Sequence, residues 1–261
     1  MMKRIILLAI CLVMIFTLVS CGNGANNSLD EVMDELNGAN TSSMDDTVSD
    51  TSSEITLTAA DIVKREYEKS GEYLFNGTKT EFNYAYPQIV LDQVGVASIN
   101  ERIKNYCEAL IDTELNAMKA SRKLGMTKMS YSAYIKGEIL SILIKSEYGY
   151  DFTLFEAINL NITTGIEQER NDIFNAAGLT SNDAAEKIKA AAEDKYVQIH
   201  GTIADRDVND TIGYAKGKAA TSIDYDVDMT LYFDEDGRLK AIVRIYELGG
   251  EEYEYHEVTV K

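Results

Sequence analysis

The 261-residue sequence contains no tryptophan, one proline, two histidines and three cysteines. Three cysteines are too few for the disulfide framework that stabilises many small secreted domains. Neither His200 nor His256 lies in a metal-ligand spacing or beside a nucleophile, and the sequence has no G-x-S-x-G, P-loop or dinucleotide-binding pattern. The sequence therefore predicts no catalytic residue, no metal site and no cofactor.

Basic residues are also scarce. The chain has 25 Lys and Arg against 43 Asp and Glu, which gives a formal charge of −18. Such a negative surface repels phosphate backbones and anionic lipid head groups. We therefore expect no nucleic-acid partner, whereas a positively charged partner would be attracted.

Apolar residues form one long run, near the N-terminus. Two basic residues precede an apolar segment at residues 5–19, and Ser20 and Cys21 follow it. This order is typical of a secretory signal peptide. The segment Leu18-Val19-Ser20-Cys21 resembles the bacterial lipobox. The resemblance implies cleavage between Ser20 and Cys21 and attachment of lipid to the Cys21 thiol.

The alternative interpretation of residues 5–19 is a transmembrane helix, and the length of the segment argues against it. It has 15 residues, where a membrane span needs about 20. Two or three acyl chains would instead hold the mature chain on the membrane, since each buried methylene contributes roughly 0.8 kcal/mol. Loss of Lys3 and Arg4 with the signal peptide changes the formal charge from −18 to −20. We expect a lipid-anchored protein on the extracytoplasmic face of the cell membrane.

The composition divides the chain into three parts. Residues 1–20 are the predicted signal peptide, and residues 21–58 form an acidic segment without Lys or Arg. This segment carries too little apolar surface to offset the entropy of ordering, so we expect a flexible tether. Residues 59–261 show apolar periodicity and are long enough for one domain.

The clearest helical pattern follows Ser98. Ser98 and Glu101 fit a capping box, and apolar residues recur behind them every three or four positions, which predicts a helix from Ser98 to Arg122. Cys107 lies on the apolar stripe of this helix. Its neighbour Glu108 would not lower the pKa of the thiol, so we expect a buried, unreactive cysteine rather than a reactive one.

Two other helices are expected. Thr180 or Ser181 can cap a helix that contains Tyr196 and ends at Gly201. A short helix over Ala59–Lys69 would open the domain.

Alternation of apolar and polar residues predicts about seven strands in a mostly antiparallel, half-buried sheet. Pro87 is expected at an edge or a strand end because it has no N–H to donate. The Asp236-Gly237 pair predicts a hairpin turn. With two main helices, these strands make an α+β domain. The expected strands are Phe82–Val90, Tyr131–Ile135, Leu140–Lys145, Phe152–Ile162, Tyr225–Phe233, Leu239–Tyr246 and Tyr253–Val260.

The order of these segments is similar to that of a known family. The residues that carry the resemblance are Tyr86-Pro87-Gln88-Ile89, Ile99-Asn100, Leu160 to Gly165, Asp172-Ile173-Phe174 and Leu231-Tyr232-Phe233 with Gly237. They resemble the extracytoplasmic domain of lysozyme-sensing anti-sigma factors and the N-terminal domain of some peptidoglycan deacetylases. The motifs are structural, so the resemblance implies a fold and carries over no catalytic residue.

The candidate binding segment is Tyr246 to Glu257, where tyrosines and glutamates alternate. Tyrosine offers a large contact area with a polar tip, and the acidic side chains would attract a cationic partner. An edge strand that its charges keep soluble is the alternative interpretation. The candidate residues are Tyr246, Tyr253, Tyr255, Glu251, Glu252 and Glu254.

Two acidic segments could hold calcium. Residues Asp205 to Asp210 begin like an EF-hand loop but lack its turn glycine and its final glutamate. Asp224, Asp226 and Asp228 would share one face of a strand. A solvated loop and the exposed face of a sheet are the simpler interpretations.

Two functional hypotheses follow. The first is a membrane-anchored, non-enzymatic binding or sensing domain for a cationic protein such as lysozyme or for cell-envelope material. The alternative is an enzyme, or an accessory protein of an enzyme, that acts on cell-wall polymer through paired carboxylates.

Overall fold

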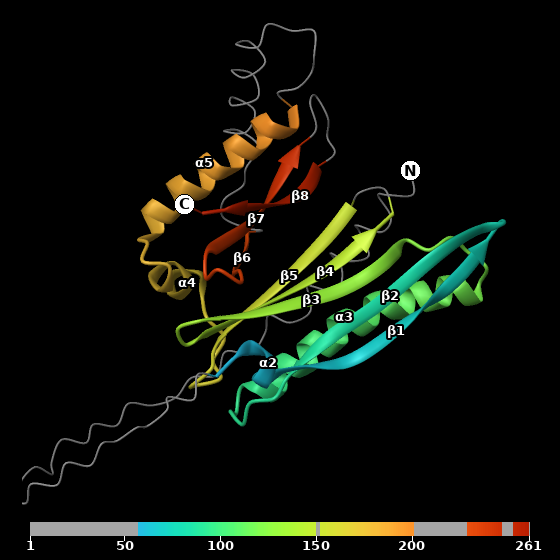
Figure 1. Ribbon diagram of the computed structural model, residues 1–261, viewed down its shortest axis with the longest axis horizontal. Helices are drawn as coiled ribbons and strands as arrows, with labels where there is room; N and C mark the ends of the chain where they lie inside the picture. The colour runs from blue at the N-terminus through green and yellow to red at the C-terminus, as the bar shows by residue number, and fades with distance from the viewer. Residues whose placement is uncertain (1–56, 150–151, 201–228, 247–252, 261) are drawn as a thin grey trace, which may run out of the picture. The chain divides into compact units, whose positions relative to one another are not determined.

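The computed structural model describes residues 57–149, 152–200, 229–246 and 253–260. All of them belong to the compact unit that extends from Glu54 to Lys261. The described residues form four helices and eight strands (Figure 1). In chain order these are α2 (Ala59–Ile62), β1 (Val63–Phe75), β2 (Thr78–Ile89), α3 (Val96–Lys119), β3 (Met126–Lys136), β4 (Ile139–Tyr148), β5 (Phe152–Asn161), α4 (Arg170–Ala176), α5 (Ser181–His200), β6 (Thr230–Phe233), β7 (Leu239–Tyr246) and β8 (Tyr253–Thr259).

The expected α+β class and the mostly antiparallel pairing are confirmed, but the strands form two sheets rather than one. The first sheet has the order β1-β2-β3-β4-β5, and the second has the order β6-β7-β8. Every adjacent pair is antiparallel except β2 and β3. The exception has a simple cause: α3 connects β2 to β3, and a crossover helix returns the chain in the same direction.

α3 covers one face of the first sheet (Figure 1). Ile99, Ile103, Cys107 and Ile111 recur every four residues along the helix and are buried against the sheet. Each such isoleucine contributes about 1.5–3 kcal/mol by leaving water. The predicted burial of Cys107 is confirmed, since its side chain is 0% exposed and burial raises the pKa of its thiol to about 12.

The start of α3 differs from the prediction. The helix begins at Val96 with Gly95 as its N-cap, and the Ser98 hydroxyl donates to the Gly95 carbonyl (2.8 Å) rather than capping the helix. Asn100 has a different role: its side chain hydrogen-bonds both the N–H and the C=O of Ile89, each at 2.8 Å. The amide thus pairs with the end of β2 as a neighbouring strand would, and it fixes the helix to the sheet.

The helix predicted over Ala59–Lys69 is wrong beyond Ile62. From Val63 the chain is extended and pairs with β2 along its whole length. Only Ile62 and Val63 are buried in this segment, and the charged residues that follow are mostly exposed on an edge strand. Charges are a common protection for such an edge. Pairing with β2 therefore outweighs the local helical preference.

Pro87 lies near the end of β2, as predicted. It is opposite Arg65, beside a bulge that leaves Glu66 without a register partner. On its other side β2 pairs with β3 only at Asn83 and Tyr84. The missing N–H of Pro87 therefore interrupts no regular ladder.

The second sheet packs between α5 and the first sheet. On one face, buried residues of β6, β7 and β8 contact α4 and α5. On the other face, Tyr232 and Ile242 contact Leu143 of β4. With α3 on its opposite side, β4 is covered on both faces, so this strand is more buried than the half-buried strand that was expected.

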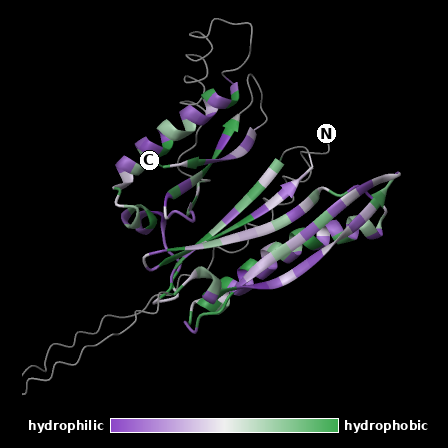
Figure 2. Cartoon of the chain, in the orientation of Figure 1, coloured by the Kyte–Doolittle hydropathy of each residue, from purple (hydrophilic) through white to green (hydrophobic). Residues whose placement is uncertain are grey.

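α5 confirms the second predicted helix, whereas α4 was not predicted. The Asp183 N–H donates to the Thr180 hydroxyl (3.2 Å), which makes Thr180 the capping residue. Ala184, Ile188, Ala192 and Tyr196 recur every four residues on the buried face of α5. Figure 2 shows hydrophilic and hydrophobic residues alternating around its turns.

Two buried polar residues connect the sheets. Asn159 donates to the Leu231 carbonyl (2.8 Å), and the Phe233 N–H donates to the Ser141 hydroxyl (3.0 Å). Ser141 in turn donates to the Asn159 side-chain oxygen (2.5 Å). β6 is an edge strand, and its outer backbone groups are buried here, so these side chains satisfy them in place of another strand.

The β6–β7 hairpin has the predicted turn, with Gly237 at a φ of +67°. Several other predictions fall outside the described residues: the signal peptide and Cys21, the tether, Gly201, Asp205 to Asp210, Asp224, Asp226 and Asp228, and the first part of the expected strand Tyr225–Phe233. Within the described part of the chain, no helix is both long and apolar enough to cross a membrane.

Candidate functional site

β8 separates the predicted binding residues instead of bringing all of them together. Tyr253 and Tyr255 lie on one face of the strand, and Glu254, between them, lies on the other because side chains alternate. Tyr246 ends β7 opposite Tyr253. Glu251 and Glu252 lie outside the described residues. The candidate residues of this segment are therefore divided between the two faces of β8, with Glu254 opposite the tyrosines.

The tyrosines already contact a cation of their own chain. The Arg244 guanidinium lies 4.9 Å from the ring centre of Tyr253 and 5.7 Å from that of Tyr255. The two rings meet edge to face with centroids 5.5 Å apart. An arginine over an aromatic face is attracted by the ring quadrupole. Contacts within the chain therefore hold the side chains of Arg244, Tyr253 and Tyr255 in place.

The aromatic contacts continue onto the first sheet. Tyr255 is 6.4 Å from Phe152 of β5, and Phe152 is 5.7 Å from Tyr148 of β4, measured between ring centroids. We call Tyr253, Tyr255, Phe152 and Tyr148 the aromatic row. All four side chains are half-buried. Burial, and to a smaller extent the charge of Glu114, raises the pKa of Tyr148 to about 12.

Glu156 lies on the same face of β5 as Phe152, four residues and so about 13 Å further along the strand. Burial raises the pKa of its carboxyl, Arg102 of α3 acts in the opposite direction, and Glu167 raises it further. Arg102 is committed elsewhere, since its two terminal nitrogens donate to the two oxygens of Glu167 at 2.8 and 2.6 Å. Within the described part of the chain, the Glu156 carboxylate accepts no hydrogen bond and forms no ion pair.

Glu257, further along β8, has the opposite environment. It accepts a short hydrogen bond from Tyr232 and lies 3.3 Å from the Lys240 ammonium and 3.7 Å from that of Lys145. Burial alone would raise the pKa of Glu257, but these three partners outweigh it and lower the pKa. Lys240 is also 3.5 Å from Asp234 and only 12% exposed. This network joins the two sheets, and its carboxylates and ammonium groups are paired with one another.

His256 lies on the face of β8 that packs against α5, and His200 is the last residue of α5. His256 is 3.5 Å from Glu254, and burial, helped by Lys195 and His200, lowers the pKa of its imidazole. His200 is buried and its ring centroid is 4.4 Å from that of Tyr196. The described residues contain no group of three or more His, Cys, Asp or Glu that could hold a metal ion.

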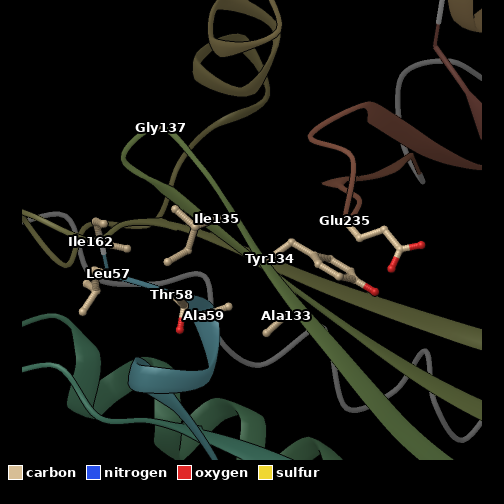
Figure 3. A pocket seen from close by; sticks show the side chains of 9 residues that line it. All are labelled: Leu57, Thr58, Ala59, Ala133, Tyr134, Ile135, Gly137, Ile162 and Glu235. Atoms are coloured by element: carbon tan, nitrogen blue, oxygen red, sulfur yellow. The ribbon is translucent and has the colours of Figure 1, made fainter. Parts of the chain in front are cut away.

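A hollow of about 580 Å³ lies beside the β3–β4 hairpin (Figure 3). Many of its lining residues are aliphatic, and Thr58, Tyr134 of β3 and Glu235 of the β6–β7 turn supply polar side chains. The described residues that line it include no pair of carboxylates and no nucleophile beside a base. The hollow therefore shows no catalytic arrangement. Its lining residues are Leu57, Thr58, Ala59, Ala133, Tyr134, Ile135, Gly137, Ile162 and Glu235.

Sequence reasoning named Tyr253 and Tyr255 as candidates but not the residues around them. Arg244 and Phe152 were assigned only to strands, and Glu156 was not considered. The available signal was the alternation in β5, which puts Phe152 and Glu156 on one face. The packing of β5 against β8 could not be derived from either pattern.

Comparison with known proteins gives little further information. No family model and no curated protein matches the chain. Among solved structures, one similar chain is a DUF3298 family protein from Pseudomonas aeruginosa, with 13% sequence identity and a TM-score of 0.35. The similarity covers 76% of this chain and 89% of that one.

Proposed function

We propose that this protein is a lipoprotein held on the extracytoplasmic face of the cell membrane through Cys21, and that its α+β domain binds a cationic protein such as lysozyme without catalysing a reaction. Envelope material with positively charged groups is the other ligand of this class. The lipobox supports the anchor, and the resemblance of the strand and turn motifs to lysozyme-sensing domains supports the partner.

One observation carries the binding function. The aromatic row includes Phe152, and Glu156, on the same face of β5 and about 13 Å further along the strand, is a half-buried carboxylate without a hydrogen-bond donor among the described residues. Aromatic rings and a carboxylate are the groups that recognise ammonium and guanidinium ions. The mature charge of −20 would raise the local concentration of such a partner.

The anchor is tested by replacing Cys21 with Ser. The variant should incorporate no radiolabelled palmitate and remain uncut, because the thiol that accepts the lipid is gone. Equal incorporation in the wild type and the Cys21→Ser variant would contradict the anchor.

Binding is tested with residues 22–261 and lysozyme. We expect an affinity that falls as the Debye length shortens from roughly 30 Å at 0.01 M salt to about 8 Å at 0.15 M. Acetylated lysozyme, whose lysines have lost their charge, is the matched control and should bind more weakly. No binding at low salt would contradict the proposed partner.

An enzyme remains the second candidate because of one pair of carboxylates. The pKa of Glu156 is raised by burial and by the charge of Glu167, which is itself paired with Arg102. Hydrolases of polysaccharides use one protonated and one ionised carboxyl group. Release of reducing ends from purified cell wall, abolished by Glu156→Gln, would favour this alternative.

A further inference from the structure

We propose that one end of the first sheet, where four exposed apolar side chains gather, contacts the surface of the lipid bilayer to which Cys21 is attached. We call these four side chains the apolar end: Leu57, Val90, Val94 and Ile166. This inference rests on the lipid anchor of the proposed function, and it adds a second contact with the membrane that the folded domain makes itself.

The apolar end holds most of the large apolar side chains that are exposed in the described part of the chain. Only Leu74 of β1 and Ile199 of α5 lie elsewhere. A single exposed apolar residue is common on a protein surface, whereas several together mark an interaction surface. The exposed fractions at the apolar end are 100% for Val94, 62% for Ile166, 46% for Val90 and 39% for Leu57.

Two connections in close contact present Val94 and Ile166. Residues 90–95 connect β2 to α3, and residues 162–169 connect β5 to α4. A Cβ atom on Gly95 would lie 2.5 Å from the Gly165 carbonyl oxygen, and a Cβ atom on Gly165 would collide with the side chain of Gln93. Val94 and Ile166 are the sequence neighbours of these two glycines. Packing that only glycine permits therefore holds the two exposed side chains near each other.

Val90 and Leu57 extend this surface along α2. The Val90 N–H donates to the carbonyl of Ile62, the last residue of α2, at 2.8 Å. Leu57 precedes α2 and lines the hollow together with Ile162 (Figure 3). The Ile162 carbonyl in turn accepts a hydrogen bond from the Gln93 side chain (3.1 Å), which joins this part to the two connections.

The chain enters the described part of the domain at this same end. Residues 22–56 lie between the proposed anchor, Cys21, and Leu57. A flexible linker of that length spans roughly 30–35 Å on average. An anchor at Cys21 would therefore keep the apolar end close to lipid, and this high effective concentration allows a contact that would be too weak for a free protein. Stable attachment to a membrane commonly combines two such contacts.

A second copy of this chain is the competing occupant. A standard protein interface takes about 20–30 residues a side, and the apolar end offers four large apolar side chains. It is therefore small for an interface between two free proteins. A bilayer contact needs less surface, because the anchor already holds the domain beside the lipid.

The charges around the apolar end restrict the kind of lipid. The two connections carry Asp92, Glu167 and Glu169, and Glu167 is paired with Arg102 of α3 at 2.6 Å. These acidic side chains are repelled by anionic head groups, so we expect contact with zwitterionic lipid through the apolar side chains. Added anionic lipid should weaken the contact, and salt should restore it by screening the repulsion. Lysozyme binding should respond to salt in the opposite direction.

The experiment couples residues 21–261 through the Cys21 thiol to a maleimide lipid in bilayer discs of zwitterionic lipid. Cys107 should not react, because it is buried and the pKa of its thiol is raised to about 12. The discs contain a spin-labelled lipid, and NMR measures how strongly the label broadens each methyl signal. We expect the signals of Val94 and Ile166 to be broadened severalfold more than that of Leu74.

Leu74 is the matched control within the same molecule. Its side chain is 67% exposed, slightly more than that of Ile166. β1 separates it from the apolar end, since this strand runs from Val63, opposite Ile89, to the β1–β2 hairpin at the other end of the sheet (Figure 1). The length of β1 makes this separation about 40 Å. Equal broadening at the two ends would mean that the domain has no preferred orientation, and would overturn the proposal.

Charged variants test whether the contact depends on the apolar end. Val94→Asp combined with Ile166→Asp should reduce the broadening of the Val90 signal to that of Leu74, whereas Leu74→Asp should leave it unchanged. These side chains are exposed, so the domain should stay folded. Val94 and Ile166 signals that shift with protein concentration in lipid-free solution would show that a second copy covers the apolar end, which would also overturn the proposal.

The chemical coupling makes this test independent of lipid attachment in the cell. If the coupled protein shows the expected broadening but the wild type incorporates no palmitate, the bilayer contact of the domain stands and the proposed anchor falls. If palmitate is incorporated but the two ends are broadened equally, the anchor stands and this inference falls.

Discussion

Glu156 and Glu257 are both half-buried carboxylates on edge strands that pack against each other, yet their environments differ in almost every other respect. Glu257 has a tyrosine hydroxyl and two ammonium groups around it, and its pKa is lowered. Near Glu156 the cation is Arg102, which Glu167 holds, and burial raises the pKa of Glu156. Partners, rather than burial, therefore decide the sign of the shift.

The comparison separates a carboxylate that connects parts of the fold from one that does not. The network around Glu257 joins β4, β6, β7 and β8 and satisfies its own charges. Glu156 makes no such connection, because its carboxylate has no hydrogen-bond donor among the described residues. A charged group that costs stability and satisfies no neighbour is more readily explained by a ligand than by the fold.

The largest effect is expected from Glu257→Ala. The substitution leaves Lys240, which is 12% exposed, and the Tyr232 hydroxyl without their acceptor. Breaking a buried ion pair in this way costs about 3–5 kcal/mol, and the partial exposure of Glu257 reduces this to about 2–4 kcal/mol of unfolding free energy. Urea unfolding measures the loss. Glu254→Ala on the same strand is the control and should cost less than about 1 kcal/mol.

A result below about 1 kcal/mol for Glu257→Ala would remove the distinction between the two carboxylates, because Glu257 would then be as dispensable as a surface charge.

Much of the fold could be predicted from local patterns. The alternation from Leu239 to Tyr246 gives the bounds of β7, and the four-residue recurrence behind Thr180 gives α5. Patterns of this kind show which side chains share a face, but not what covers that face. The split into two sheets and the burial of β4 on both sides were missed for this reason.

The site was less predictable than the fold. The tyrosines of β8 were named as candidates because they are concentrated in a short segment. Glu254 was named with them, although the period of two in a strand puts it on the opposite face from its neighbours. Phe152 belongs to β5, and only the packing of β5 against β8 brings its ring to Tyr255.

The smallest effect, and the sharpest test of the comparison, is the pH dependence of stability. The pKa of Glu156 is raised above its ordinary value of 4.5, so the folded protein holds this proton more tightly than the unfolded chain. Stability should therefore fall as the pH rises from about 4.5 through the raised pKa. The pKa of Glu257 is lowered from 4.5, so its contribution is present above that value and is lost as the pH falls below it. Stability is measured by urea unfolding at a series of pH values. Glu156→Gln should remove the fall in stability above pH 4.5, and Glu257→Gln should remove the fall in stability below pH 4.5. If the two variants changed the curve in the same pH range and with the same sign, the opposite shifts of the two carboxylates would be wrong, and with them the argument that Glu156 lacks a partner.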